Sequence, residues 1–369
     1  MKDKFIFLEF LRGLSALAVC ISHIRNFLFL DYLNIESPSF FTSLFYFLTS
    51  LGHSAVIVFF VISGYLVGGQ CYQNFILKKF SFKKYLIDRI VRLWVVLIPA
   101  LFLTLCLDMI GIKLIDNSGY NGSLYNILGS GPIEFNDSNN YSIKTLIGNI
   151  FFLQTILLPV YGTNSPLWSL AYEFWYYLFF PFLLYLYFNN KGYRFINIIL
   201  LILLIIYFFP TDLLIGFIYW FLGFIVFLLH SKFINSGKNY LKILSAFFFI
   251  FIVSIDQLSK TYISHLFLSL SAAILILNFN NVTLNSPYIK KIILFFSNIS
   301  YSMYLIHFPI IAFIFFVFIA PYQYQPNFMA FFIFFIILFF IILITFIFWF
   351  LFEKRTLSIK KYLYLKFKV

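Results

Sequence analysis

Charged residues are scarce in this sequence. Asp, Glu, Lys and Arg make up 11% of its 369 residues, whereas about a quarter of a soluble globular protein is charged. Hydrophobic residues make up 62%, a share that excludes a soluble globule. Charge-free runs such as 195–209 and 328–352 are typical of membrane spans, because about 20 helical residues cross about 30 Å of hydrocarbon. We therefore expect an all-α, polytopic integral membrane helix bundle.

Cysteine is scarce as well. The three cysteines, Cys20, Cys71 and Cys106, lack the spacing of metal ligands, and an odd number gives no disulfide framework. Free cysteine prefers burial, so we expect these side chains to act as small buried apolar groups. The histidines and acidic residues also form no cluster with metal-ligand spacing, so no metal site is predicted.

Ten apolar segments are predicted to cross the membrane. They run roughly over 6–28, 48–69, 92–112, 167–188, 195–210, 213–229, 243–257, 262–278, 292–319 and 328–352. Together they form a single membrane domain over 1–369, with both termini in the cytoplasm. The stretch 113–166 is a predicted extracytoplasmic loop region, whose Asn-, Gly- and Ser-rich core suits a lid or an acceptor-binding loop. The segment 353–369 is a predicted basic cytoplasmic tail.

The basic residues follow this topology. All but four of the 26 Lys and Arg residues fall at or inside the cytoplasmic face, and the exceptions are Arg25, Lys113, Lys144 and Lys260. Basic residues beside cytoplasmic span ends set the orientation of membrane proteins. The net charge of +13 is thus a topological signal and predicts no binding of nucleic acid. We expect a multi-pass protein of the cell inner (plasma) membrane.

Two ionisable residues interrupt the first predicted span. Arg12 and His23 are eleven residues apart, which places them on one stripe of a helix, about 16 Å apart along its axis. Ionisable groups inside a span are costly and mark functional sites. His23 is a candidate general base for a hydroxyl nucleophile, and a histidine bound to a backbone carbonyl is the structural alternative. Arg12 is open to three roles: contact with a donor thioester, or pairing with Glu9 or Glu173.

A second pair of cations precedes the third predicted span. Arg89 and Arg92 have the i, i+3 spacing that places them on one face of a helix. Two guanidinium groups on one face form a fork that binds phosphate in bidentate fashion. We therefore predict that this pair binds a phosphate-bearing cytosolic donor. The alternative is an anchor that contacts the anionic headgroups of membrane lipids.

The fourth predicted span begins with a carboxylate among aromatic residues. Glu173 has Trp168 and Tyr172 beside it. In the functional interpretation Glu173 orients His23 or binds acceptor hydroxyls, and the two aromatic residues contact the substrate. The structural alternative is an interfacial tryptophan with a carboxylate that is paired to Arg12.

The other histidines carry weaker signals. His307 precedes a proline in the ninth predicted span and is a candidate substrate contact. The Ser-Gly pair at 63–64 is expected to serve helix packing, because small residues let helices approach closely in membranes. The remaining histidines are His53, for which a direct role is less expected, and His230 and His265, which lie near span ends where solvated side chains are expected.

Five segments, in order along the chain, resemble one family. They are EFLRG at 9–13 with His23, GHSAVIVFFVISGYL at 52–66, RIVR at 89–92, PLWSLAYE at 166–173 and ISYSMYLIHFP at 299–309. Together they closely resemble the integral-membrane acyltransferase-3 family, the bacterial O-acyltransferases of surface glycans. The chain departs from the family pattern at Glu9, where Asp is commoner, and after Glu353, where Pro often follows closely.

The resemblance implies transfer of an acyl group, usually acetyl, from acyl-CoA to a sugar hydroxyl. The expected donor is acetyl-CoA, and the expected acceptor is a cell-surface glycan or a lipid-linked oligosaccharide. The family's essential Arg and His correspond to Arg12 and His23. Its Arg-x-x-Arg motif, which is linked to coenzyme A binding, corresponds to Arg89 and Arg92.

Two other classes of protein compete with this interpretation. A transporter or flippase for a lipid-linked glycan is the main alternative, but such proteins often show paired half-repeats with broken helices, which we do not find in the sequence. A scaffold within a glycan-synthesis complex would leave the buried Arg12, His23 and Glu173 unexplained, given the cost of inserting them.

Overall fold

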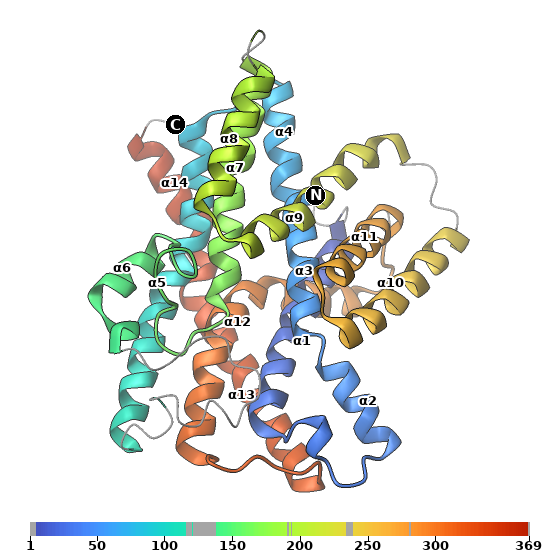
Figure 1. Ribbon diagram of the computed structural model, residues 1–369, viewed down its shortest axis with the longest axis vertical. Coiled ribbons are helices and arrows are strands. Elements are labelled where there is room, and N and C mark those ends of the chain that lie inside the picture. The colour runs from blue at the N-terminus through green and yellow to red at the C-terminus, as the bar shows by residue number, and fades with distance from the viewer. Residues whose placement is uncertain are drawn as a thin grey trace.

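The structure is a computed structural model, and it describes residues 5–115, 120, 138–189, 192, 194–233, 239–279 and 282–367. The named elements within these residues are helical, and no strand is found among them. The helices are α1 (Ile6–Leu28), α2 (Phe40–Thr49), α3 (Gly52–Ser63), the π-helix η3 (Gly64–Gly68), α4 (Gly69–Ile76), α5 (Phe82–Leu114), α6 (Ile143–Ile150), α7 (Leu167–Asn189), α8 (Arg194–Phe208), α9 (Thr211–Phe233), α10 (Asn239–Ser259), α11 (Tyr262–Phe279), α12 (Pro287–Phe318), α13 (Phe328–Leu351) and α14 (Thr356–Phe367). Figure 1 shows them as one bundle, and the predicted all-α polytopic fold is confirmed.

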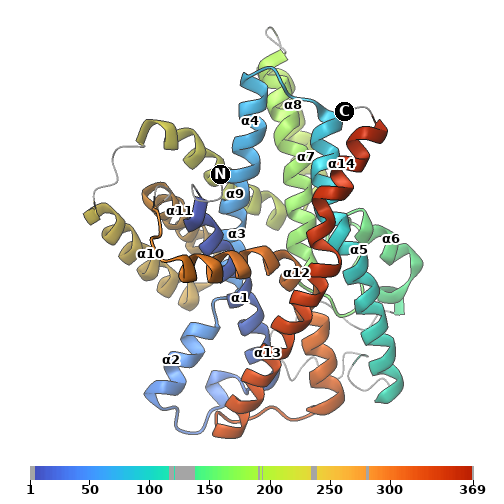
Figure 2. The ribbon, with the colours of Figure 1, turned by 180° about the vertical axis from the view of Figure 1, so that it is seen from behind.

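Eight segments of the described chain are helices long and apolar enough to cross a membrane. They coincide with eight of the ten predicted spans. The predicted span 195–210 is a shorter apolar helix, α8, and the predicted span 167–188 is the 23-residue helix α7. The helix α7, which contains Glu173 and several tyrosines, is not among the eight helices that qualify on length and mean hydropathy. In both views α7 nevertheless runs lengthwise through the bundle between α4 and α5 (Figures 1 and 2).

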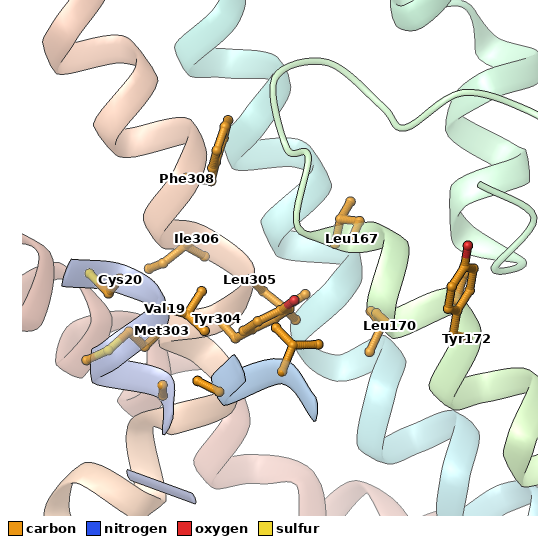
Figure 3. Close-up of a cluster of buried hydrophobic side chains, with 14 of the residues drawn as sticks. Val19, Cys20, Leu167, Leu170, Tyr172, Met303, Tyr304, Leu305, Ile306 and Phe308 are labelled. Atoms are coloured by element: carbon orange, nitrogen blue, oxygen red, sulfur yellow. The ribbon is translucent and has the colours of Figure 1, made fainter. Parts of the chain in front are cut away.

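The centre of the bundle is the crossing of α1 and α12. A Cβ atom added at Gly13 would lie 3.0 Å from the Cβ of Phe296 and 3.1 Å from the backbone nitrogen of Ser297, so the two helices almost touch there. Figure 3 shows the apolar side chains that gather around this crossing, with Val19 and Cys20 from α1 beside Met303 from α12. The tight crossing brings residues near the start of the sequence against residues near position 300.

The helices α3 and α9 also cross at close range, at the Ser-Gly pair that the sequence assigned to packing. A Cβ atom at Gly64 would lie 1.7 Å from the carbonyl oxygen of Trp220, and one at Gly223 would lie 1.9 Å from the carbonyl oxygen of Val61. Small residues permit this approach of two backbones in a membrane. The helix winds as a π-helix over Gly64–Gly68, so the change in winding begins at the contact residue itself.

We expect Gly64→Ala to reduce the amount of folded protein in the membrane strongly. The added methyl group meets backbone atoms of α9, which cannot rotate away as a side chain can, and overpacking of this kind costs about 1–3 kcal/mol or more. Gly192→Ala is the matched control, because a Cβ there meets nothing within 4 Å. The measurement is the yield of monodisperse protein after detergent extraction, and equal yields for the two variants would contradict the prediction.

Four short helices, α2, α4, α6 and α14, lie wholly or mostly outside the predicted spans. The side chain of Ser39 caps α2, and that of Ser142 caps α6, by accepting hydrogen bonds from the backbone N–H of Thr42 and Thr145. The predicted cytoplasmic tail contains the helix α14. Most of the core of the predicted lid loop, 116–119 and 121–137, lies outside the described residues, so the lid stays a prediction.

Candidate functional site

A cavity of about 260 Å³ lies among α1, α3, α4, α5, α7 and α12. Four of the residues that the sequence singled out line it together: Arg12, Arg89, Arg92 and Glu173. Its other polar lining residues are Ser63, Gln70, Ser169, Tyr177, Ser300, Tyr301 and Tyr304, and its apolar walls include Val56, Phe59, Phe60, Leu66 and Leu170. The structure thus brings the cations of two different helices, Arg12 of α1 and the arginine pair of α5, to one space.

The cavity has two different ends. Gln70 is exposed and Arg89 is partly exposed at one end, whereas Ser169 and Tyr304 are buried at the other. From Val56 to Gln70 the lining follows about four turns of helix, which corresponds to about 20 Å. The cavity is therefore an elongated pocket with its arginines between an accessible end and a buried end.

Arg12 is held by groups on its own helix and on α12. A guanidinium nitrogen lies 2.7 Å from the carboxylate of Glu9 and donates a 3.0 Å hydrogen bond to the carbonyl oxygen of Ser297. The Ser297 hydroxyl in turn donates to Glu9. The Arg12 side chain keeps 26% of its surface exposed. Of the three roles left open by the sequence, pairing with Glu9 is thus present, and the guanidinium still borders the cavity.

Arg92 is paired with a carboxylate from the far end of the sequence. Its guanidinium lies 2.8 Å from Glu353, which follows α13 and is buried. The other carboxylate oxygen of Glu353 accepts hydrogen bonds from the backbone and the hydroxyl of Ser302, at 3.2 and 2.7 Å. The guanidinium also lies over the ring of Tyr301, 5.1 Å from its centroid. Glu353 therefore fixes Arg92 in the wall of the cavity.

Arg89 differs from the other two arginines because no Asp or Glu of the described chain lies within ion-pair distance of it. Its guanidinium lies 5.7 Å from the ring centroids of both Tyr85 and Tyr177. Aromatic faces stabilise a cation without neutralising its charge. Arg89 thus leaves an uncompensated positive charge at the accessible end of the cavity, where an anionic ligand would be attracted.

The helix α14 lies along the beginning of α5, next to these arginines (Figure 2). Lys360 lies 3.0 Å from Asp88, and the Tyr364 hydroxyl donates a 2.6 Å hydrogen bond to the same carboxylate. Lys83 donates to the carbonyl oxygen of Phe367 at 2.7 Å. The predicted tail is thus a helix that is fastened to the segment carrying Arg89 and Arg92.

Glu173 ends a short chain of hydrogen bonds across the cavity wall. The Tyr177 hydroxyl donates to Glu173 at 2.5 Å and lies 3.2 Å from the Ser63 hydroxyl, which accepts from the indole N–H of Trp220 at 3.1 Å. The carboxylate is therefore oriented by residues of α7, α3 and α9. The structural alternative, an ion pair between Glu173 and Arg12, is not seen among the described contacts.

His23 does not line the cavity and lies against α12 instead. Its ring is 5.3 Å from that of His307 and 4.9 Å from that of Phe308. His307 is fully buried, and its Nδ1 donates a 2.9 Å hydrogen bond to the carbonyl oxygen of Met303. The Nε2 atom of His307 has no hydrogen-bond partner among the described residues. Two histidines from the first and the ninth predicted spans thus form a pair, which sequence spacing did not indicate.

Trp168 and Tyr172 face away from the cavity. Their rings contact each other at 5.3 Å, and Trp168 stacks on His53 at 6.1 Å. The His53 ring also lies 4.6 Å from the ring of His265. His265 is only 8% exposed and lies 3.6 Å from the buried carboxylate of Asp256. The expectation that His265 is solvated is therefore wrong, because the end of α11 packs against α3 and α10. These residues form a second polar cluster, separate from the arginines.

Comparison with known proteins gives a family. The family model described as an acyltransferase domain matches residues 5–350, nearly the whole chain. No curated protein and no solved structure matches the sequence. The match confirms the resemblance that the five sequence segments carry. Glu353 and α14 lie just beyond the matched region, although Glu353 pairs with Arg92 and α14 contacts Asp88, next to Arg89.

Proposed function

The chain belongs to the acyltransferase-3 family, and on that premise we propose that it is a membrane O-acyltransferase that moves an acetyl group from acetyl-CoA to a glycan hydroxyl. The observation that carries the proposal is the cavity lined by Arg12, Arg89 and Arg92, with no carboxylate of the described residues within ion-pair distance of Arg89. A transporter of a neutral glycan has no need of such a cluster.

The donor enters from the accessible end of the cavity. Coenzyme A carries phosphates, and arginine binds phosphate through two parallel hydrogen bonds. The cavity, at about 260 Å³, is smaller than the roughly 300–1,000 Å³ of pockets that enclose a whole drug-sized ligand. We therefore assign the phosphates to Arg89 and Arg92 near the opening, and the thioester arm to the interior past Arg12.

The acceptor is a surface glycan or a lipid-linked oligosaccharide that approaches from the opposite side of the membrane. There the partly exposed Trp168 provides an aromatic surface for a sugar ring, and the buried Tyr172 packs against it. In the reaction His23 takes the proton of the attacking sugar hydroxyl as its oxygen bonds to the thioester carbon. The carbon–sulfur bond then breaks, and the coenzyme A thiolate leaves and takes up a proton. An acyl relay on His23 is the alternative form of the same transfer. His307 and Glu173 position the reacting groups.

The test uses membranes that contain the wild-type chain and membranes from cells without it. Isotope-labelled acetyl-CoA and extracted surface glycan are added, and base-labile label on the glycan is measured by mass spectrometry. We expect label only with the chain present. If none appears with several acyl-CoA donors and several glycans, and glycan instead crosses sealed vesicles without any donor, the transporter hypothesis replaces this one.

A further inference from the structure

The second polar cluster contains a buried carboxylate near the end of α10. Asp256 is only 2% exposed, and its two carboxylate oxygens accept 2.7 Å hydrogen bonds from the hydroxyls of Ser54 in α3 and Ser264 in α11. These three helices lie together on the flank of the bundle away from α14 (Figures 1 and 2). No Arg or Lys side chain of the described residues lies within ion-pair distance of Asp256. A charged group inside a span is costly and marks a functional site.

Two histidines lie next to this carboxylate. The Nε2 atom of His265 is 3.6 Å from Asp256, and the His265 ring is 4.6 Å from the His53 ring. His265 is buried, and its Nε2 atom has no hydrogen-bond partner among the described residues. Buried polar atoms without a partner are rare in folded proteins, and a functional role is one reason for them. His53, in contrast, is exposed, so the cluster runs from a buried charge to an exposed imidazole.

Trp168 lies at the exposed end of the cluster. Its indole is partly exposed and stacks on the His53 ring, with 6.1 Å between the centroids and 20° between the planes. A sugar ring presents C–H groups on its faces and hydroxyl groups around its edge. An indole offers an apolar surface to the C–H groups, and an imidazole can donate to or accept from the hydroxyls. An exposed indole beside an exposed imidazole therefore suits a sugar ring.

The start of α3 brings this cluster close to the helix that carries His23. A Cβ atom added at Gly52 would lie 2.8 Å from both the Cβ and the Oγ of Ser22, so α1 and α3 nearly touch there. His23 follows Ser22 in the chain, and His53 follows Gly52. An oligosaccharide bound at His53 is therefore held by the part of α3 that adjoins the proposed general base.

We propose that His53, next to Trp168, binds a neutral sugar ring of the acceptor, and that His265 and Asp256 position His53. The proposal rests on the proposed function, because it takes the ligand to be the glycan acceptor of an acyltransferase. Asp256 attracts the His265 imidazole, which packs against His53 and holds the exposed ring in place before the sugar arrives. The carboxylate repels an acidic sugar, which is why the ring is a neutral one. The same charge repels the phosphates of the donor and keeps the two substrates apart.

The first test measures acyl transfer to oligosaccharides cut from the host's surface glycan, with the full-length chain in membranes. We expect His53→Ala to raise the KM for the oligosaccharides about tenfold, the effect of about one lost hydrogen bond and its contacts, with the KM for acetyl-CoA unchanged. His53→Gln keeps a hydrogen-bonding side chain, so its KM should rise less. His230→Ala is the matched control, because His230 lies near the end of α9 and belongs to neither the cavity nor the second polar cluster.

The positioning role of Asp256 is tested with Asp256→Asn. A serine hydroxyl accepts as well as donates hydrogen bonds, so an amide can stay bound to Ser54 and Ser264 while the charge beside His265 is lost. A merely structural role predicts an unchanged KM for the oligosaccharides in a variant that folds. We expect this KM to rise severalfold, with kcat and the KM for acetyl-CoA as in the wild type. His265→Gln serves if Asp256→Asn does not fold.

A binding measurement gives a readout that does not depend on turnover. The purified protein is heated with the oligosaccharides, with the same oligosaccharides after oxidation of their primary hydroxyls to carboxylates, or with coenzyme A. We expect the neutral oligosaccharides to protect the wild type against unfolding better than the oxidised ones do, and to protect it better than His53→Ala. Coenzyme A should protect the wild type and His53→Ala alike.

Two kinds of contrary result are distinguishable. An oligosaccharide KM that His53→Ala leaves unchanged, equal protection of the wild type and His53→Ala, or better protection by the oxidised oligosaccharides overturns the inference and leaves the acyltransferase intact. A wild type that transfers no acyl group and is protected by neither coenzyme A nor oligosaccharide overturns the proposed function itself.

Discussion

Replacing His23 with alanine is expected to lower the rate of acyl transfer by about 10²- to 10⁴-fold, the usual contribution of a general base. The chain should still fold, because His23 is not fully enclosed and its neighbour His307 keeps its own bond to the Met303 carbonyl. The measurement is the transfer of labelled acetyl to glycan at matched protein abundance in the membrane.

A second substitution at His23 and one at His307 distinguish a role in the proton transfer from a role in packing. His23→Gln retains hydrogen-bonding capacity but cannot take a proton near neutral pH, so it should be as inactive as His23→Ala. His307→Gln should retain more activity than either, because His307 acts by positioning. If His23→Gln works at the wild-type rate, His23 has no role as a base or as an acyl relay.

Removing the charge of Glu353 is expected to weaken both the fold and the binding of donor. In Glu353→Gln one of the two side-chain positions becomes an amide N–H₂, which then faces either the Arg92 guanidinium or the backbone N–H of Ser302, neither of which can accept a hydrogen bond. A buried donor left without an acceptor costs about 1–3 kcal/mol. We expect a lower thermal unfolding temperature and a raised KM for acetyl-CoA.

A double variant distinguishes the two effects. Replacing a buried ion pair with apolar residues of similar size is often neutral for stability, so Arg92→Met with Glu353→Met should recover much of the thermal stability. It should not recover the KM, because the phosphate-binding guanidinium is gone. A double variant with the wild-type KM would show that Arg92 does not contact the donor.

Arg89 and Arg92 show which features of the site a local sequence pattern can predict. The i, i+3 spacing of Arg89 and Arg92 predicts a shared face, and both side chains line the same cavity. Helical periodicity suffices for that prediction, because both residues lie within one turn of α5. The membrane spans are predictable for a similar reason, since apolar length is a local property of the chain.

Other parts of the site depend on packing between distant segments. The contact between Arg92 and Glu353 and that between His23 and His307 both need a particular arrangement of helices that no local pattern encodes. The motif ISYSMYLIHFP contains Tyr304 and His307, but the sequence alone does not show that Tyr304 lines the cavity and that His307 adjoins His23. The helices α2 and α6 carry Ser39 and Ser142 as capping signals, which a search for short helices could have used.

The pairing of Glu9 with Arg12 has a consequence for biogenesis. A charged side chain within a membrane span is costly to insert, and α1 is synthesised long before α12 can supply the Ser297 carbonyl. Because Glu9 lies one turn away on the same helix, α1 carries its own counterion as it leaves the translocon. The first helix can therefore enter the bilayer with the charge of Arg12 already paired to Glu9. The hydrogen bond from Arg12 to the Ser297 carbonyl forms later, when α12 packs against α1.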